Sequence, residues 1–165
     1  QPREKCAGVG RPKGHENNKH KRLRFCVLVR LRCRNMSNRI SVICITGTRE
    51  KLQMGAMVAS VGAATGADVT VFLSMNALPY FVKDSTEVAP SEGEMGRVMD
   101  AEPGVPDYKE LFQQAVELGD AKILPCPMVM DVLKLSKDDL MDEVGPVTGL
   151  TKFLSDAEGS QVFTF

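Results

Sequence analysis

Four short apolar runs, separated by longer segments, constrain the fold of this chain more than any other feature of its sequence. Ile40 to Thr46 and Asp68 to Ser74 are nearly continuous and rich in β-branched residues, and Ala121 to Leu124 and Gln161 to Phe165 are shorter. The first of these runs is typical of a strand buried on both faces of a parallel sheet, and the other three have the length and composition of strands. We therefore expect four strands whose connections cross from one end of the sheet to the other.

The segments between these runs have helical periodicity and recognisable ends. Arg49 to Thr65 places small and apolar residues on one stripe, and Gly66 ends it. Asp107 is a typical N-cap for a helix running to about Leu118. Further short helices are expected over Met75 to Val82, Met128 to Leu133 and Thr148 to Ala157, the last with Leu150, Phe153 and Leu154 inward, and a cap is expected at Ser136. Between Lys83 and Pro106 we expect a long loop.

The resulting order, β-α-β-α-β-α-α-β, predicts an α/β fold. The expected architecture is a three-layer α/β/α arrangement around a mostly parallel sheet of about four to five strands, with flavodoxin-like topology. Functional residues of such sheets lie at the carboxyl ends of the strands. We therefore expect a substrate site formed by the residues that follow three of the strands, namely Gly47, Thr48, Met75, Asn76, Cys126, Pro127 and Met128.

The charge distribution divides the chain at about Met36. Residues 1–35 hold 11 Lys or Arg and two Glu, whereas residues 36–165 hold 10 Lys or Arg and 19 acidic residues. Two functions fit the basic part: a nucleic-acid-binding arm, or zinc binding through its Cys and His residues. We favour a third interpretation, in which residues 1–35 are a basic extension, disordered or not native, and residues 36–165 are the folded domain.

The domain contains no His, which excludes Ser-His-Asp and Cys-His catalysis and His-based metal sites within residues 36–165. We expect no metal and no cofactor. Its Cys residues are Cys44 and Cys126. Cys44 lies inside the first predicted strand, where a buried apolar role is expected. No apolar run approaches the roughly 18 residues of a membrane-spanning helix, so we expect no such helix.

Cys126 is the candidate nucleophile. It lies where the third strand ends and a helix begins, between Pro125 and Pro127. A thiolate at a helix N-terminus is stabilised by unpaired N–H groups, which can lower a Cys pKa from about 8.5 to between roughly 3.5 and 7.5. The alternative is a buried structural Cys.

Other residues carry weaker signals. Gly47-Thr48 is too short for a phosphate-binding loop, so a tight turn is expected there. The acidic group Asp138, Asp139, Asp142 and Glu143 lacks calcium-loop spacing and is interpreted as a solvated helix start. We interpret the Met residues, including Met54 and Met57, mostly as core, with Met75, Met128 and Met130 able to form an apolar pocket around Cys126.

Three stretches resemble the DsrE/DsrF-like family of small sulfur-handling proteins, whose members are sometimes labelled peroxiredoxin-like. They are Ile-Cys-Ile-Thr-Gly-Thr at 43–48, Gly-Ala-Asp-Val-Thr-Val-Phe at 66–72 and, most specific, Ile-Leu-Pro-Cys-Pro-Met-Val-Met-Asp-Val-Leu at 123–133. The resemblance covers residues 38–165. It implies that Cys126 is the sulfur-carrying residue, and that the protein forms oligomers around a parallel sheet.

The resemblance implies a sulfur carrier or sulfurtransferase that holds sulfane sulfur or thiosulfonate on Cys126. Some relatives have a second Cys near the active one, and this sequence has none there, so transfer would go to another protein or a small thiol. The implied partners are other copies of the chain, a small sulfur-carrier protein and a heterodisulfide-reductase-like complex. For residues 36–165 we expect neither nucleic-acid nor membrane binding.

Two other functions remain open: a non-catalytic binding or scaffold subunit of a sulfur-relay complex, and, more weakly supported, a thiol peroxidase. The sequence has no Thr-x-x-Cys motif at Cys126 and no resolving Cys, which disfavours the peroxidase. A free functional thiol requires a reducing compartment, so we expect a cytoplasmic protein.

Overall fold

The computed structural model describes residues 38–165, so the predictions made for the basic residues 1–35 lie outside the described part of the chain. Strands and helices alternate from the beginning, as the apolar runs predict. In chain order they are β1 (Arg39–Cys44), α2 (Arg49–Ala64), β2 (Asp68–Leu73), the 3-10 helix η1 (Met75–Phe81), α3 (Glu94–Ala101), α4 (Tyr108–Gly119), β3 (Lys122–Pro125), α5 (Pro127–Leu133), the 3-10 turn η2 (Lys137–Asp139), α6 (Leu150–Asp156) and β4 (Gln161–Thr164). The expected α/β class is confirmed.

The sheet has four parallel strands in the order β3-β2-β1-β4. Strand β1 is therefore central, and β4 pairs beside it, with Ile40 opposite Gln161. At the edge of the sheet formed by β3, residues 144–148 run along that strand. Val144 forms a parallel bridge with Ile123, and the N–H of Thr148 donates to the carbonyl oxygen of Pro125 at 3.2 Å. This segment covers the edge of β3.

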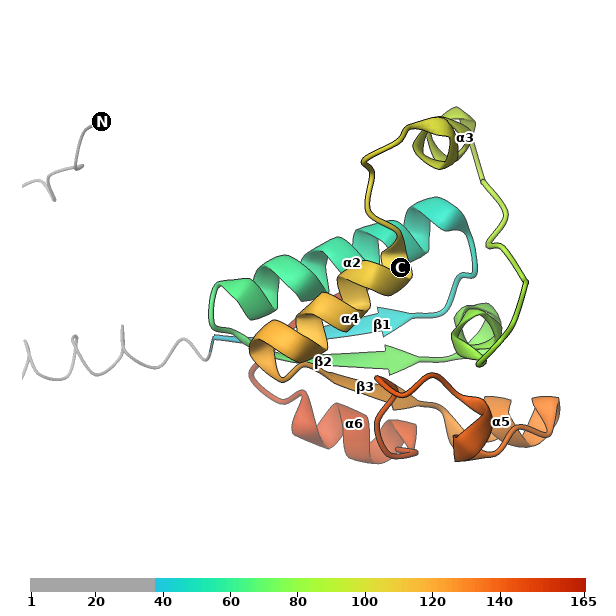
Figure 1. Ribbon diagram of the computed structural model, residues 1–165. Coiled ribbons are helices and arrows are strands. Elements are labelled where there is room, and N and C mark those ends of the chain that lie inside the picture. Colours follow the sequence, from blue (N-terminus) through green and yellow to red (C-terminus); the bar gives the residue numbers. More distant parts are fainter. Residues whose placement is uncertain (1–37) are drawn as a thin grey trace, which may run out of the picture. The chain divides into compact units, whose positions relative to one another are not determined.

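Helices cover both faces of the sheet (Figure 1). Helices α2 and α4 pack together on one face, and they approach so closely that a Cβ on Gly119 would lie 2.6 Å from the Cβ of Ala63. Helix α6 lies on the opposite face, where the Phe153 ring stacks on Phe72 with centroids 4.9 Å apart. The buried stripe of α2 is the predicted one, Leu52, Ala56, Ala59 and Ala63. Together these contacts form the three expected layers.

The predicted loop from Lys83 to Pro106 is wrong in part, because it contains helix α3. Gly96 is the one buried residue of this helix, and its apolar residues Met95 and Val98 face solvent. Helix α3 is attached by polar groups instead. The Glu50 carboxylate accepts hydrogen bonds from the N–H groups of Glu92, Gly93 and Gly96 at 2.8 to 3.0 Å. Met95, Val98 and Met99 recur at helical spacing, but this helix buries only Gly96, so an expected core contact does not identify it.

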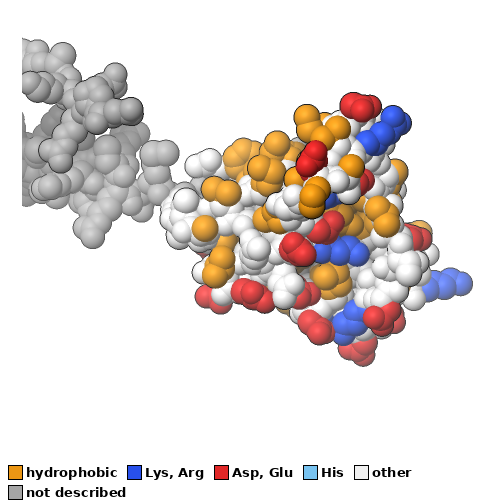
Figure 2. All heavy atoms as spheres, turned by 45° about the horizontal axis from the view of Figure 1, so that its top comes forward, with side chains coloured by type: hydrophobic (Ala, Val, Ile, Leu, Met, Phe, Trp, Pro, Cys, Tyr) orange, Lys and Arg blue, Asp and Glu red, His pale blue; other side chains and the backbone are white. Residues whose placement is uncertain are grey.

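Several predicted core positions are also exposed. In α6, Phe153 is buried as expected, but Leu150 and Leu154 are about half exposed, because this short helix turns only one residue fully toward the sheet. On α2, Met54 and Met57 lie outside the core together with Val61. Figure 2 shows apolar side chains gathered on this side of the domain, on the face that carries α2 and α3.

Candidate functional site

The carboxyl ends of β1, β2 and β3 lie at one edge of the sheet, because the three strands are parallel and in register (Figure 1). Cys44, Leu73 and Pro125 form one row across them. The segments that follow this row are the β1–α2 turn, η1 and α5. The predicted site residues belong to these segments, so the fold brings them to one edge.

Cys126 links β3 to α5 and is largely covered. Its N–H donates to the carbonyl oxygen of Leu73 at 2.9 Å, and its own carbonyl accepts from the N–H of Met130 at 3.1 Å. It is the N-cap of α5, with Pro127 at the first helical position, as the sequence predicts. The residue is 7% exposed, and its sulfur forms no disulfide. Only a small part of this residue is therefore accessible to reagents.

The strand pattern fixes the face on which the Cys126 side chain lies. Cys126 continues β3 with an extended backbone, and side chains alternate along a strand, so it shares a face with Leu124. Leu124 pairs with Phe72, which stacks on α6. The thiol is therefore on the α6 side of the sheet. Pro127 is partly buried beside it and Met128 is half exposed.

Ser74 is a neighbour of Cys126 that the sequence analysis missed. Leu73 pairs with Pro125, so the next residues of the two strands, Ser74 and Cys126, come side by side on the same face. Ser74 is 5% exposed. Only the strand register reveals this neighbour, because the two residues are far apart in sequence and Ser74 belongs to no motif.

Gly47 and Asn76 form a second close pair at this edge. A Cβ on Gly47 would lie 2.2 Å from the Asn76 carbonyl oxygen and 2.5 Å from Cε2 of Tyr80. The Asn76 N–H donates to the carbonyl oxygen of Ile45 at 3.0 Å. Gly47 therefore allows the connection between β1 and α2 to pack against η1.

Met75 begins η1 with φ of 49°, in the left-handed region that disfavours residues with a side chain. Such strain of about 1–3 kcal/mol is found most often at functional sites. Met75 and Met128 are both half exposed, whereas Met130 is buried in the core. The three Met residues thus occupy different environments around the edge.

Thr48 is turned toward a different part of the molecule. Its hydroxyl donates to the Glu92 carboxylate at 3.3 Å, in the segment that carries α3. Strand β2 separates the β1 end, where Thr48 lies, from the β3 end, where Cys126 lies. The structure therefore brings Gly47 to Asn76, and Ser74 to Cys126, but directs Thr48 to the α3 segment.

Arg49 is a buried cation near the carboxyl end of β1, and it contacts the same α3 segment. Its side chain is 4% exposed, and its Nε lies 2.7 Å from the Asp100 carboxylate. Its guanidinium also donates to Gln53 and lies over the Tyr108 ring at 5.4 Å from the centroid. The neighbouring Glu50 has its pKa lowered to about 2 by the N–H groups of Glu92 and Gly93. These two side chains anchor α3.

The remaining titratable candidates are structural. Burial raises the pKa of Cys44 to about 12, so this thiol stays protonated, as expected for a buried apolar side chain. Asp139 forms a capping box with Ser136, and Asp142 pairs with Lys83 at 2.7 Å. These contacts lower the pKa of both carboxyl groups. Within residues 38–165, no group of three His, Cys, Asp or Glu side chains is arranged to hold a metal ion.

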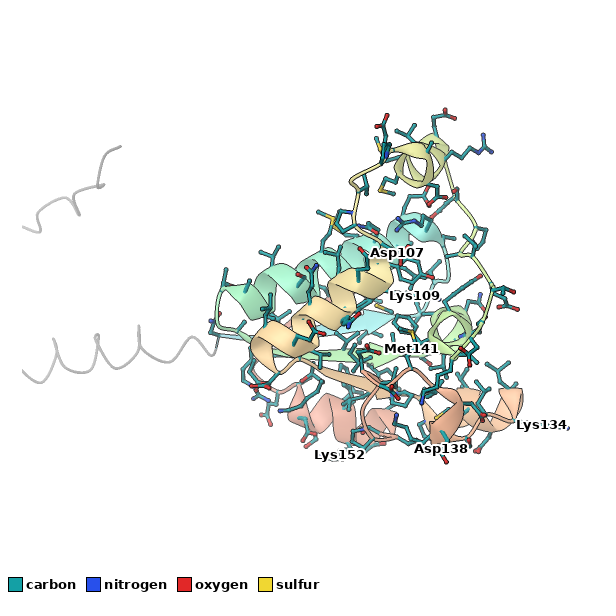
Figure 3. The ribbon with its side chains drawn as sticks, in the orientation of Figure 1. Asp107, Lys109, Lys134, Asp138, Met141 and Lys152 are labelled. Atoms are coloured by element: carbon teal, nitrogen blue, oxygen red, sulfur yellow. The ribbon has the colours of Figure 1, made fainter. Side chains whose placement is uncertain are left out.

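Charged side chains of the α5 and α6 layer lie away from the thiol. Lys134 follows α5 at the end opposite Cys126, and Lys152 on α6 pairs with Asp156 at 2.7 Å. Both project outward in Figure 3. In the described part of the chain, no helix is both long and apolar enough to cross a bilayer.

Two solved structures have a similar fold. The ychN protein from E. coli superposes with a TM-score of 0.55 at 17% identity, over 77% of this chain and 99% of that one. MTH1491, a protein of unknown function from Methanobacterium thermoautotrophicum, has a TM-score of 0.52 at 13% identity, over 77% of this chain and 98% of that one. These low identities show a common fold. No curated protein matches the chain.

A family model matches the carboxyl-terminal part of the domain. The model of the DsrE/DsrF/DrsH-like family matches residues 87–165, which include β3, Cys126 and α5. The most specific stretch of the predicted resemblance, 123–133, lies within this range, whereas the stretches at 43–48 and 66–72 precede it. Over residues 87–165, the chain is similar to the DsrE/DsrF/DrsH-like family.

Proposed function

We propose that the protein is a sulfur carrier that holds sulfane sulfur or thiosulfonate on Cys126 and passes it to an acceptor. Similarity to the DsrE/DsrF/DrsH-like family suggests a role related to sulfur relay. The observation that carries the assignment to Cys126 is its position: within the matched range, it ends a strand at the carboxyl edge of a parallel sheet, where such folds bind ligands.

The proposed chemistry is thiol exchange at sulfur. The Cys126 thiolate attacks a sulfur atom of a polysulfide, the donor S–S bond breaks, and the donor leaves one sulfur shorter, which produces a persulfide. With tetrathionate the same attack releases thiosulfate and leaves a thiosulfonate on Cys126. An acceptor thiolate then attacks the sulfur that is bonded to Sγ of Cys126, the bond between these two sulfur atoms breaks, and Cys126 leaves as thiolate. No oxidant is consumed in either direction.

Substrate contacts are proposed for the residues around this edge. Met75, Asn76 and Met128 are exposed, and Pro127 adjoins the thiol. Gly47 is proposed to act by holding the turn against Asn76. Thr48 is the least supported of the proposed contacts, because its hydroxyl is bonded to Glu92.

The proposed partners are other copies of this chain, a small sulfur-carrier protein and a heterodisulfide-reductase-like complex, in the cytoplasm. Exposed apolar residues on the outer side of α2, namely Met54, Met57 and Val61, support association with further protein. The proposed domain boundary at residues 35 and 36 follows from the change in charge between the two parts of the chain.

The experiment is mass spectrometry of the full chain after incubation with polysulfide and, separately, with tetrathionate. Peptide mapping assigns each adduct, because Cys6, Cys26 and Cys33 also carry thiols. We expect sulfur or thiosulfonate on the Cys126 peptide of the wild type and of Cys44→Ser, and none at that position in Cys126→Ser.

A second candidate function is a non-catalytic scaffold subunit, which the burial of Cys126 favours. In that case Cys126 acquires no adduct in the native protein and reacts only after unfolding. That outcome would overturn the sulfur-carrier proposal.

A further inference from the structure

The Ser74 hydroxyl lies where a serine ordinarily forms a capping hydrogen bond, but it forms none. It is the N-cap of η1, where a serine ordinarily accepts hydrogen bonds from the N–H groups two and three residues ahead. Those donors are already occupied: the Asn76 N–H donates to the Ile45 carbonyl at 3.0 Å, and the Ala77 N–H to the Ser74 carbonyl at 3.1 Å. The side chain therefore makes no capping hydrogen bond.

This hydroxyl nevertheless reaches the surface. Ser74 is 5% exposed, and within residues 38–165 every fully buried side-chain nitrogen or oxygen has a hydrogen-bond partner. An unpaired hydroxyl must therefore touch solvent through the small exposed fraction of the residue. The donor is therefore available to a partner beside it or to a ligand that reaches it.

Cys126 is beside it. The Ser74 N–H donates to the Cys44 carbonyl and the Cys126 N–H to the Leu73 carbonyl, both at 2.9 Å, so both residues keep the parallel hydrogen-bond pattern. Their side chains lie on the face of Phe72 and Leu124, on neighbouring strands, which ordinarily run about 4.8 Å apart. Ile45, which follows β1, lies in the same row as Ser74 and Cys126 and is 40% exposed.

In this structure the Ser74 hydroxyl makes no hydrogen bond to the Cys126 sulfur. We propose that the hydroxyl turns to donate a hydrogen bond to that sulfur when it carries a negative charge, and so stabilises the anion. A hydrogen bond to a charged group favours the charged form. The thiolate needs this support for attack, and a persulfide anion on the same residue would use it as well. The role in sulfur transfer rests on the proposed function, whereas the hydrogen bond itself does not.

Ser74→Thr and Ser74→Val are the matched variants, because both add a branched side chain of similar shape and only Thr keeps the hydroxyl. The measurement is the far-ultraviolet absorbance of thiolate in the full chain, followed as the pH is raised. Each variant is compared with the same variant carrying Cys126→Ser, which removes the contribution of the other thiols. The rate of Cys126 alkylation, followed by peptide mapping, is the second readout.

We expect the Cys126 thiolate to form at a higher pH in Ser74→Val than in Ser74→Thr, with alkylation about tenfold slower in Ser74→Val, as for a lost hydrogen bond to a charged group. Equal thiolate signals and equal alkylation rates in these two variants would overturn the proposal.

Ser74→Cys tests the juxtaposition separately. Neighbouring strand positions lie within the Cα range of about 4.4–6.8 Å that a disulfide needs, so treatment with diamide should join residues 74 and 126. The control is Thr70→Cys, on the same face of β2 but four residues away, about 13 Å along the strand. If both variants form the crosslink to the same extent, Ser74 is not the neighbour of Cys126 and the proposal is wrong.

Failure of this proposal and failure of the proposed function are distinguishable. The thiolate and crosslinking measurements use no sulfur donor. A chain that shows the Ser74 effect but takes up no sulfur would retain this inference and overturn the sulfur-carrier function, and a chain that takes up sulfur equally in Ser74→Thr and Ser74→Val with unchanged thiolate would do the reverse.

Discussion

Gly47 lies so close to Asn76 that a Cβ on Gly47 would be 2.2 Å from the Asn76 carbonyl oxygen. The obstruction is backbone, which cannot rotate away. We therefore expect Gly47→Ala to lower the free energy of unfolding by about 1–3 kcal/mol, the usual cost of overpacking. Chemical denaturation measures it. Gly149→Ala is the control, since no atom lies within 4 Å of its added Cβ. Equal losses in both variants would contradict the close contact.

Phe153 holds α6 on the sheet by stacking on Phe72. Phe153→Ala should reduce the free energy of unfolding by about 3–5 kcal/mol, because it leaves a cavity in the core. Leu154→Ala is the matched control: its side chain is 53% exposed, and we expect a change within about 0.5 kcal/mol. A large loss in Leu154→Ala would show that α6 turns a different face to the sheet.

Asp107 caps α4 by accepting the Lys109 N–H at 2.8 Å. Asp107→Ala should cost about 1 kcal/mol of stability, as N-cap removal usually does. Asp107→Asn keeps an acceptor and should recover most of this loss, apart from the weak ion pair to Arg49 at 3.8 Å. Thermal unfolding of the three proteins distinguishes the cap from the charge. Equal destabilisation by Ala and Asn would assign the effect to the charge.

Glu50 should make the attachment of α3 sensitive to acid. Backbone N–H groups lower its pKa in the folded protein to about 2, below the usual value of about 4.3. A lowered pKa stabilises the attached state fully above the usual value, and this support is lost as the pH falls toward 2. The protection of the Gly93 and Gly96 amides against hydrogen exchange should therefore decrease over that range.

The amides of α4 provide the internal reference for this measurement, because Glu50 does not bond to them. In Glu50→Gln the carboxyl group is gone, so protection of Gly93 and Gly96 should no longer vary with acid over the same range. Protection that stays constant in the wild type would show that Glu50 does not hold α3 as its carboxylate.

The features that the sequence predicted well are local ones. Strands β1, β2 and β3 were predicted because their apolar runs report burial directly, whereas β4 was predicted from its β-branched and aromatic residues although all of it is exposed. Helices α2 and α4 were predicted because their stripes and caps lie within the elements themselves. Helix α3 was missed because its attachment is polar and comes from Glu50, more than 40 residues away. Leu150 and Leu154 were misplaced because an apolar residue in a seven-residue helix does not show which face packs.

The candidate site likewise combines local features, which could be predicted from the sequence, and features that depend on several segments, which could not. The position of Cys126 at a strand end was predictable from Pro125, Pro127 and the apolar run before them. The proximity of Gly47 to Asn76, and of Ser74 to Cys126, depends on how separate segments align across the sheet. No periodicity within one segment contains that information.

The central position of β1 has a consequence for synthesis of the chain on the ribosome. β1 is made first, yet one of its edges is filled by β4, at the far end of the described residues. Until that strand emerges, a newly made chain has an open edge that is apolar and ready to pair with any other strand. We expect stalled or shortened chains that lack Gln161–Thr164 to aggregate and to depend on chaperones, while chains that contain this strand cover the edge of β1 themselves.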